Sequence, residues 1–415
     1  MTPSARRRAT LWLVFALAQL WSATLGWVLP SQPMGDVVLV YEPWATAALA
    51  GGPVMGVTET WVYPQLALLP MVVAKWGAAP LVGALGVSSA YLVAWVALIA
   101  ALDALAFGLL LGRAPDAPRR AAAWFWCATL VLLGPIALYR LDAVTLPLVV
   151  IAGVRLASRP ALAAALLTVG AWIKIWPAAI LLAALVTVRR RLRLLVAAVT
   201  VTLGVLAVLL VGGARGEILG FLTEQSGRGL QIEAVAATPF LWLAAVGSAR
   251  IEYSFDILTF QISAPGADTI AALLTPVMVV VVAGVLLVAV RKAARGAVFT
   301  RLFPPTALAL VGALIVTNKV GSPQFQVWLI APVILWFVLD RVRAGIPAGI
   351  VLALCTLTCL VYPLSYDALL QAQVLPILVL SSRNVLLLVL LVVAIRTLLR
   401  VPVLSSAHRP STLRE

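Results

Sequence analysis

Residues 269–290 read TIAALLTPVMVVVVAGVLLVAV and contain no charged side chain. A helix needs about 20 consecutive apolar residues to cross the hydrocarbon core of a bilayer, and these residues supply them. Charge returns at once on both sides, with Asp268 before the run and Arg291 after it. We therefore predict a transmembrane helix over residues 269–290.

The rest of the chain has the same apolar character. Of its 415 residues, 63% are hydrophobic and 11% are charged, whereas a soluble domain is about half apolar and about a quarter charged. This composition predicts an all-α fold, a membrane bundle of about 12 (10–13) helices that forms a single integral membrane domain over residues 1–415. The expected spanning segments are 10–29, 82–112, 121–138, 143–157, 194–212, 269–290, 302–317, 325–339, 346–364 and 374–399.

Residues 161–188 form an apolar segment that is too long for one crossing. Pro177 lies inside it, and arginines flank both of its ends. If both flanks are cytoplasmic, the segment enters the membrane and returns as two short helices, with residues 174–177 near the outer face. Irregular backbone at that depth is tolerated only where protein or a water-filled cavity satisfies its polar groups.

The first apolar run resembles a signal peptide, because Arg6, Arg7 and Arg8 precede it. No small-residue cleavage site follows before Leu29, so we expect a retained first helix.

The basic residues indicate the orientation of the chain. The net charge is +15, and most of the 30 Lys and Arg residues lie in short clusters at the ends of apolar runs. Cytoplasmic loops carry such an excess in membrane proteins. We therefore predict a multi-pass plasma-membrane protein with both termini in the cytoplasm, including a tail over about 401–415. Membrane lipids then account for the charge, and nucleic acid is not expected as a partner.

Two outward segments, about 30–80 and about 213–268, are too long to be simple connectors. Both contain aromatic and apolar residues, which argues for folded loops rather than disorder. Residues 37–50 fit a helix that lies on the membrane surface. Residues 61–77 could cross the membrane, but we expect them to dip into or lie on the outer leaflet, because a crossing would invert the charge pattern. The chemistry of the protein is therefore expected on its outer face.

Few kinds of chemistry remain open. His408 is the only histidine and lies in the tail, so a catalytic triad or a histidine metal site is excluded. The three cysteines, Cys127, Cys355 and Cys359, lie in apolar segments and are expected to be buried hydrophobic residues. No phosphate-binding loop motif occurs, which argues against an ATP-driven pump. We predict no metal and no cofactor.

Asp36 follows the first apolar run and begins the segment DVVLVYE, which ends at Tyr41 and Glu42. A carboxylate at the start of a surface helix can cap that helix or act as a base above the lipid headgroups. Glu42 could be a second base, a sugar ligand or a solvated charge. Tyr41 belongs to the same candidate substrate-binding segment.

Arg140 and Asp142 form a compact pair at a helix end that we expect on the outer face. They are either a structural ion pair or part of a substrate site. Lys174 lies between two apolar half-helices, where a lone ammonium is costly and needs an anion or a carboxylate partner. Asp103 is different, because it lies inside a spanning segment, as helix–helix glue or as part of a proton path.

Polar residues also gather in three later places on the expected outer side. The segment 228–233, RGLQIE, alternates polar and apolar residues, so one of its faces can point at a cavity. The segment 318–326, NKVGSPQFQ, is too rich in hydrogen-bonding groups for a simple turn. The last spanning helix carries an early polar pair. The candidate substrate-binding residues in these places are Arg228, Gln231, Glu233, Lys319, Gln324, Arg383 and Asn384.

In their order and spacing these motifs resemble a known family. The series comprises Asp-x-x-x-x-Tyr at 36–41, WVYPQLALL at 61–69, Arg140-x-Asp142, AWIKIWPA at 171–178, RGLQIE, KVGSPQF and Arg383-Asn384. It is similar to the GT-C superfamily of polytopic glycosyltransferases. The resemblance is to the family 87 group, formerly a domain of unknown function, which includes actinobacterial α-mannosyltransferases that use polyprenyl-phosphate-mannose. It covers about residues 10–400.

The resemblance implies a polyprenyl-phosphate sugar donor, bound from the outer leaflet, and a glycan or glycolipid acceptor outside the cytoplasm. It also implies that the essential carboxylate lies in the first outer loop, where Asp36 matches. Some relatives use a histidine on a later outer loop, and this chain has none there. Gln324, Glu233 or Arg228 is left to fill that place.

These inferences lead to one main functional hypothesis and two rivals. The main hypothesis is an inverting sugar transfer, without a metal, in which Asp36 is the general base and cationic side chains hold the departing polyprenyl phosphate. The first rival is a carrier or flippase for a lipid or a lipid-linked sugar, which broken helices would suit. The second is a non-catalytic subunit of an envelope-synthesis assembly.

Overall fold

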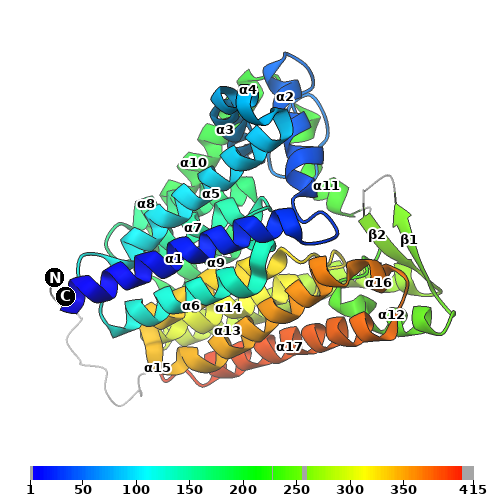
Figure 1. Cartoon of the computed structure of the whole chain (residues 1–415). Helices are drawn as coiled ribbons and strands as arrows, with labels where there is room; N and C mark the ends of the chain where they lie inside the picture. Colours follow the sequence, from blue (N-terminus) through cyan, green and yellow to red (C-terminus); the bar gives the residue numbers. More distant parts are fainter. Residues whose placement is uncertain (1–2, 227, 255–258, 404–415) are drawn as a thin grey trace, which may run out of the picture.

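The computed structural model describes residues 3–226, 228–254 and 259–403. The chain folds as a nearly all-helical, multi-pass membrane protein (Figure 1). The helices are α1 Pro3–Val28, α2 Glu42–Leu49, α3 Leu68–Ala78, α4 Val82–Leu85, α5 Val87–Leu111, α6 Ala117–Leu133, α7 Asp142–Arg155, α8 Pro160–Ile173, α9 Pro177–Thr187, α10 Arg191–Val211, α11 Gly220–Ser226, α12 Thr238–Ala245, α13 Ala267–Ala294, α14 Phe299–Val316, α15 Phe325–Cys359, α16 Tyr366–Leu370 and α17 Val374–Leu399.

The bundle is held together around α15, which contacts α6, α7, α14 and α17. Aromatic rings fill the space between α1, α5 and α6, where Phe15 stacks on Phe107 with ring centroids 4.2 Å apart. By contrast, α10 and α13 leave apolar side chains exposed, with Val208 72% and Val280 70% exposed. Apolar side chains directed outwards are expected of helices that face lipid.

In the described part of the chain, nine helical segments are long and apolar enough to cross a membrane, so the expected number of about 12 crossings is not confirmed. One of the nine, Phe325–Leu364, is broken at Asp340, whose φ of −149° and ψ of 70° are not helical. The break separates the two expected spans, 325–339 and 346–364. The nine are Ala5–Val28, Gln65–Leu85, Val87–Leu111, Ala117–Ala137, Arg191–Val211, Ala267–Ala294, Phe299–Val316, Phe325–Leu364 and Val374–Leu399.

The expected pair of short helices within residues 161–188 is confirmed as α8 and α9. Lys174 has extended backbone, with φ −151° and ψ 131°, and Pro177 is the first residue of α9. Proline suits the first turn of a helix because the N–H that it lacks would have no helical partner there. The two helices pack against each other, so the chain turns back at this break.

One expectation at the start of the bundle needs correction. Residues 82–112 do not form one helix, because Gly86 has φ 75° and ends α4 before α5 begins. A positive φ is accessible to glycine without a steric penalty. Most of the segment 61–77, which was expected to dip into or lie on the outer leaflet, belongs to Gln65–Leu85, a helical run long and apolar enough to cross. Residues 37–50 are helical as expected, through a π-helical turn over Val37–Tyr41 followed by α2.

The fold is not purely α-helical. The second long segment, 213–268, contains an antiparallel hairpin of β1 Arg250–Ser254 and β2 Thr259–Ser263. Each strand alternates polar and apolar residues, which is the pattern of a half-buried strand. The expectation of an all-α fold is wrong in this segment alone, because strands this short are easily overlooked beside long apolar helices.

The bundle has one basic end and one end that carries the hairpin. At the basic end, Arg119 and Arg155 both line a hollow of about 420 Å³. Lys292 Nζ donates to the carbonyl of Val401 (2.7 Å). Trp12, in the first half of α1, packs on Phe107 near the end of α5. Figure 1 shows the hairpin at the end far from the start of α1. Basic residues of the segments 113–120 and 155–159 therefore lie together, and Lys292 lies beside the start of the expected tail. His408 and most of the expected tail lie outside the described residues.

Candidate functional site

Asp36 lies in the turn between α1 and the π-helical segment Val37–Tyr41. Its carboxylate makes no capping hydrogen bond, so the cap interpretation finds no support. Instead, Asp36 Oδ2 lies 3.0 Å from Arg140 Nη1, and its side chain stays 40% exposed. The carboxylate is therefore positioned by an ion pair and still open to a partner outside the protein.

Arg140 connects this turn to the core of the bundle. Its guanidinium is buried, and Nη2 donates to the hydroxyl of Tyr362 (2.9 Å). The Tyr362 hydroxyl in turn donates to the carbonyl of Ser31 (3.3 Å). Ser31 and Gln32 both have positive φ, 59° and 44°, so the turn that carries Asp36 is a tight one that needs such support.

The charge state of Arg140 follows from these contacts. Burial by itself lowers its pKa, but Asp36 and the Tyr362 phenol raise the pKa above the ordinary value for arginine. Arg140 is therefore a permanent cation beside Asp36. It holds the carboxylate in place through the ion pair.

Asp142 and Lys174 form a second pair, in which Lys174 Nζ lies 3.6 Å from Asp142 Oδ2. Trp328 Nε1 donates to the other carboxylate oxygen of Asp142 (2.5 Å). Asp142 begins α7, where the helix dipole favours a negative charge, and Lys174 lies at the break between α8 and α9. The expectation that Lys174 needs a partner is confirmed, and that partner is a carboxylate of the protein.

Tyr63 lies between these two pairs. Lys174 Nζ is 4.3 Å from the centre of its ring, a cation–π contact. Burial raises the pKa of Tyr63, Asp36 and Asp142 raise it further, and Lys174 and Arg228 oppose the rise. Four of the predicted site residues therefore act on one phenol, which places them in one neighbourhood.

Arg228 and Lys319 add positive charge to this neighbourhood. Burial lowers the pKa of Arg228. Burial also lowers the pKa of Lys319, and the nearby Arg228 lowers it further. Arg228 Nε is buried and makes no hydrogen bond. Two cations that repel each other in a partly desolvated place are suited to an anion between them.

Arg383 and Glu233 form a different kind of pair. Arg383 Nη1 lies 2.6 Å from Glu233 Oε2, and both side chains are 3% exposed or less. Arg383 Nη2 also donates to the Glu233 carbonyl (2.7 Å) and to Asn384 Oδ1 (3.0 Å), and Asn384 Nδ2 donates to Thr238 Oγ1 (2.8 Å). We predicted that these residues bind substrate, but here they bind one another and anchor the segment after Arg228.

The buried pair nevertheless borders the site. Burial raises the pKa of Tyr366, Glu233 and Tyr362 add to the rise, and Arg140 and Arg383 oppose it. The rings of Tyr362 and Tyr366 meet edge to face with centroids 5.1 Å apart. Two phenols therefore connect the Asp36–Arg140 pair to the Glu233–Arg383 pair.

Segments 228–233 and 318–326 lie directly against each other, as a shared site requires. Gln231 N donates to the carbonyl of Lys319 (3.0 Å). A Cβ on Gly321 would lie 2.0 Å from Ala234 N, so only glycine allows this approach. Gln324, beside this contact, is half-buried at the start of α15 and does not cap the helix.

Two further predicted residues make internal contacts. Glu42 pairs with Lys75 on α3 and accepts a hydrogen bond from Thr46 Oγ1 (2.9 Å). Tyr41 is 1% exposed, and its hydroxyl accepts a hydrogen bond from Leu141 N (3.3 Å). Burial raises the pKa of Tyr41, and Tyr63, Asp36 and Asp142 raise it further. Tyr41 therefore lies in the same neighbourhood, and substrate binding by Glu42 and Tyr41 stays a prediction.

Four aromatic residues of the site were not predicted as site residues: Tyr63, Trp328, Tyr362 and Tyr366. Tyr63 lies in the segment WVYPQLALL, whose concentration of aromatic residues was the available signal. The other three carry no charge and stand in apolar sequence, so nothing in the local pattern marks them.

Among residues 3–226, 228–254 and 259–403, no three His, Cys, Asp or Glu side chains gather in a way that could hold a metal ion. No protein-family model, no curated protein and no solved structure matches the chain. What the site does must therefore be argued from its own residues.

Proposed function

We propose that this protein is a membrane glycosyltransferase of the polyprenyl-phosphate-sugar-dependent kind, moving a hexose, mannose by the resemblance of its motifs, onto a glycan or glycolipid. One observation carries the proposal. A half-exposed carboxylate, Asp36, lies in the same neighbourhood as Lys174 and Arg228, around the ring of Tyr63. A carboxylate beside cationic side chains suits a general base next to a bound phosphate group.

Asp36 and the cationic side chains have different roles in the proposed reaction. Asp36 accepts the proton of the acceptor hydroxyl while that oxygen bonds to the anomeric carbon of the sugar. The bond from the anomeric carbon to the phosphate oxygen breaks, and polyprenyl phosphate leaves with the electron pair. Arg228 and Lys319 stabilise its charge, because they are neighbouring cations in a partly desolvated place.

Arg140 and Lys174 serve as positioning residues. Arg140 holds Asp36 through the ion pair and holds the preceding turn through Tyr362. Lys174 contacts the carboxylate of Asp142 and lies over the ring of Tyr63, so it holds both side chains in position at the edge of the site. Preorganised charge of this kind acts without reorganisation at the moment of reaction.

The sidedness of the bundle also supports the proposal. Asp36 pairs with Arg140 just before α7, whereas Arg155 lies in the last turn of α7, and positive clusters favour the cytoplasm. We therefore propose a plasma-membrane protein with both termini in the cytoplasm and a site that opens to the outer face, where a lipid-linked sugar donor and a glycan acceptor meet.

The test is Asp36→Asn in purified protein reconstituted into vesicles with a radiolabelled polyprenyl-phosphate sugar and membrane acceptors. Loss of the base is expected to lower label transfer by about 10²–10⁴-fold, with unchanged folding. Asp367→Asn, which alters an exposed aspartate at the start of α16, is the matched control and should transfer normally. Transfer by Asp36→Asn at the wild-type rate would remove Asp36 from the mechanism.

A carrier or flippase is the second candidate, because the break between α8 and α9 at Lys174 resembles the discontinuous helices of transporters. The same vesicles distinguish the two functions, since a carrier moves the labelled lipid across the bilayer unchanged. Asp103 does not favour the carrier: it is 1% exposed and accepts a hydrogen bond from Gln19 Nε2 (2.8 Å), a contact that joins α5 to α1.

A further inference from the structure

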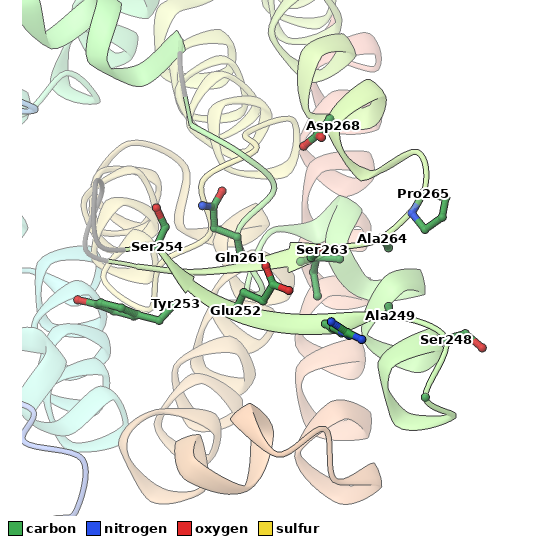
Figure 2. Close-up of a pocket in the computed structure, with 13 residues that line it drawn as sticks. Ser248, Ala249, Glu252, Tyr253, Ser254, Gln261, Ser263, Ala264, Pro265 and Asp268 are labelled. Atoms are coloured by element: carbon green, nitrogen blue, oxygen red, sulfur yellow. The ribbon is translucent and has the colours of Figure 1, made fainter.

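A hollow of about 690 Å³ lies over the β-hairpin, separate from the neighbourhood of Tyr63. Its floor is formed by β1 and β2. Its walls are the connection from α12 to β1, around Ser248, and the first turn of α13, with Asp268 (Figure 2). None of these residues is used by the mechanism above.

The two faces of the hairpin differ in character. Cross-strand partners share a face, and successive residues alternate between faces. One face is apolar, with the pairs Ile251–Ile262 and Tyr253–Phe260, and it packs towards Tyr366 (ring centroids 6.2 Å from Phe260). On the other face every side chain is polar. Its cross-strand pairs are Arg250–Ser263, Glu252–Gln261 and Ser254–Thr259.

Charges of both signs line the hollow. Arg250, Glu252 and Asp268 form no ion pair within the described ranges, and Gln261 adds an amide. Neither sign is in large excess, so a phosphate or a metal cation is not the favoured occupant. A neutral ligand with many hydroxyl groups satisfies such a set, because each hydroxyl both donates and accepts.

A row of polar side chains leads from this hollow towards the proposed reaction site. Glu252 pairs with Gln261 across the hairpin, and Gln261 pairs in turn with Gln231 on the other edge of β2. Because cross-strand partners share a face, the side chains of Glu252, Gln261 and Gln231 all lie on the polar face of the hairpin. Gln231 N donates to the carbonyl of Lys319, and Gly229 leaves room for the Gln261 amide, since a Cβ there would lie 2.0 Å from its oxygen.

We propose that the polar face of the hairpin binds the acceptor as an extended, uncharged oligosaccharide, whose reacting end points along this row towards Lys319 and Arg228. The inference rests on the proposed function, because it gives the acceptor of that reaction its chemical class and its place. The hollow then decides which glycan is extended, whereas the Tyr63 neighbourhood performs the transfer.

Binding tests the inference without catalysis. Purified full-length protein in detergent is titrated with fluorescently tagged linear tetrasaccharides of α-linked mannose, glucose or arabinose, and fluorescence anisotropy is recorded. We expect at least one of the three to bind. The double variant Arg250→Gln with Glu252→Gln should weaken that binding by about tenfold or more, since two charged hydrogen-bonding partners are lost. The control is the double variant Glu59→Gln with Arg215→Gln, which makes the same two changes at exposed residues outside the hollow and should bind the tetrasaccharide like the wild type.

Hydrogen exchange supplies a second readout that does not depend on a variant. The bound tetrasaccharide should protect backbone amides of residues 247–254 and 259–263 in the wild-type protein. Absence of binding to all three sugars, full binding by the double variant, or protection confined to other segments would each overturn the inference.

Asp36→Asn separates this inference from the proposed function. The variant should bind the tetrasaccharide like the wild type. If the wild-type protein binds the sugar at the hairpin but never transfers label, the transferase proposal fails while the glycan site stands. If label is transferred but the hairpin binds no sugar, the glycan site fails alone.

Discussion

Two carboxylate–guanidinium pairs of the site, Asp36–Arg140 and Glu233–Arg383, have opposite environments. In Asp36–Arg140 the atoms lie 3.0 Å apart and the carboxylate is 40% exposed, whereas in Glu233–Arg383 they lie 2.6 Å apart and both side chains are almost fully buried. In both pairs the arginine is distant in sequence from the carboxylate. The exposed carboxylate of Asp36 can therefore contact a substrate, whereas the buried pair of Glu233 and Arg383 only holds the neighbouring segments in place.

The difference has an energetic consequence. In the first pair only the carboxylate is exposed, so water can replace part of its interaction, and Arg140 keeps its hydrogen bond to Tyr362 when the charge of Asp36 is removed. A buried pair that loses one partner leaves a desolvated charge behind, which costs about 3–5 kcal/mol. Substitutions in the first pair should thus affect transfer, and substitutions in the second should affect folding first.

Arg383→Met should give the largest loss of stability. It leaves the Glu233 carboxylate buried without its cation, and the free energy of unfolding is expected to fall by about 3–5 kcal/mol. Thermal unfolding in detergent measures the change. Asp36→Asn is the matched comparison and should unfold within a few degrees of the wild type. Equal melting temperatures for all three proteins would contradict the division between the two pairs.

Gly321→Ala should have the next largest effect. The new Cβ would lie 2.0 Å from Ala234 N, so the segments that carry Lys319 and Glu233 must separate. Overpacking of this kind costs about 1–3 kcal/mol, and transfer should fall as the cationic group shifts. Thermal unfolding and label transfer are measured together. Gly345→Ala is the control, because no atom lies within 4 Å of the added Cβ. A Gly321→Ala protein with normal transfer and stability would refute the close contact.

The lowered pKa of Lys319 predicts a pH effect of a few-fold on phosphate binding. The side chain loses its proton at a lower pH than a free lysine, so affinity for polyprenyl phosphate should fall as pH rises through that lowered pKa. Folding responds in the opposite sense: the unfolded state binds more protons, so stability rises with pH in that window. Product inhibition is measured from neutral pH to about pH 10.

Lys319→Arg is the informative variant for this effect, because arginine stays charged throughout that range. Its inhibition by polyprenyl phosphate should not weaken with pH. If the variant and the wild type lose affinity in parallel, Lys319 does not hold the phosphate.

Glu42→Gln should have the smallest effect. The Glu42–Lys75 pair is partly exposed, so its loss costs less than about 1 kcal/mol. Because the pair points at α3 and not at the site, transfer should stay close to the wild-type rate in the radiolabel assay. A loss as large as that of Asp36→Asn would make Glu42 a substrate ligand.

Much of the fold could be predicted from the sequence, since a spanning helix is local. The lengths of apolar runs predicted most of the bundle, and Lys174 with Pro177 predicted the break between α8 and α9. The hairpin was missed because each strand holds only a few residues of alternation. The break at Gly86 was missed because glycine is also common inside membrane helices.

The residues of the site could be predicted better than their partners. Charge in an apolar chain is costly, so Asp36, Arg140, Lys174 and Arg228 stood out. Which carboxylate meets which cation depends on tertiary packing, and so the pairing of Asp36 with Arg140 could not be read from the sequence. For the same reason the sequence predicted Arg383 as a substrate-binding residue, whereas in the structure its guanidinium pairs with Glu233.

A cryo-EM structure of the protein with bound polyprenyl phosphate tests the central claim most directly. The account predicts phosphate density in contact with Arg228 and Lys319, and Asp36 facing the place where the anomeric carbon would lie. Phosphate bound at the basic end of the bundle, beside Arg119 and Arg155, or out of reach of Asp36, would contradict it.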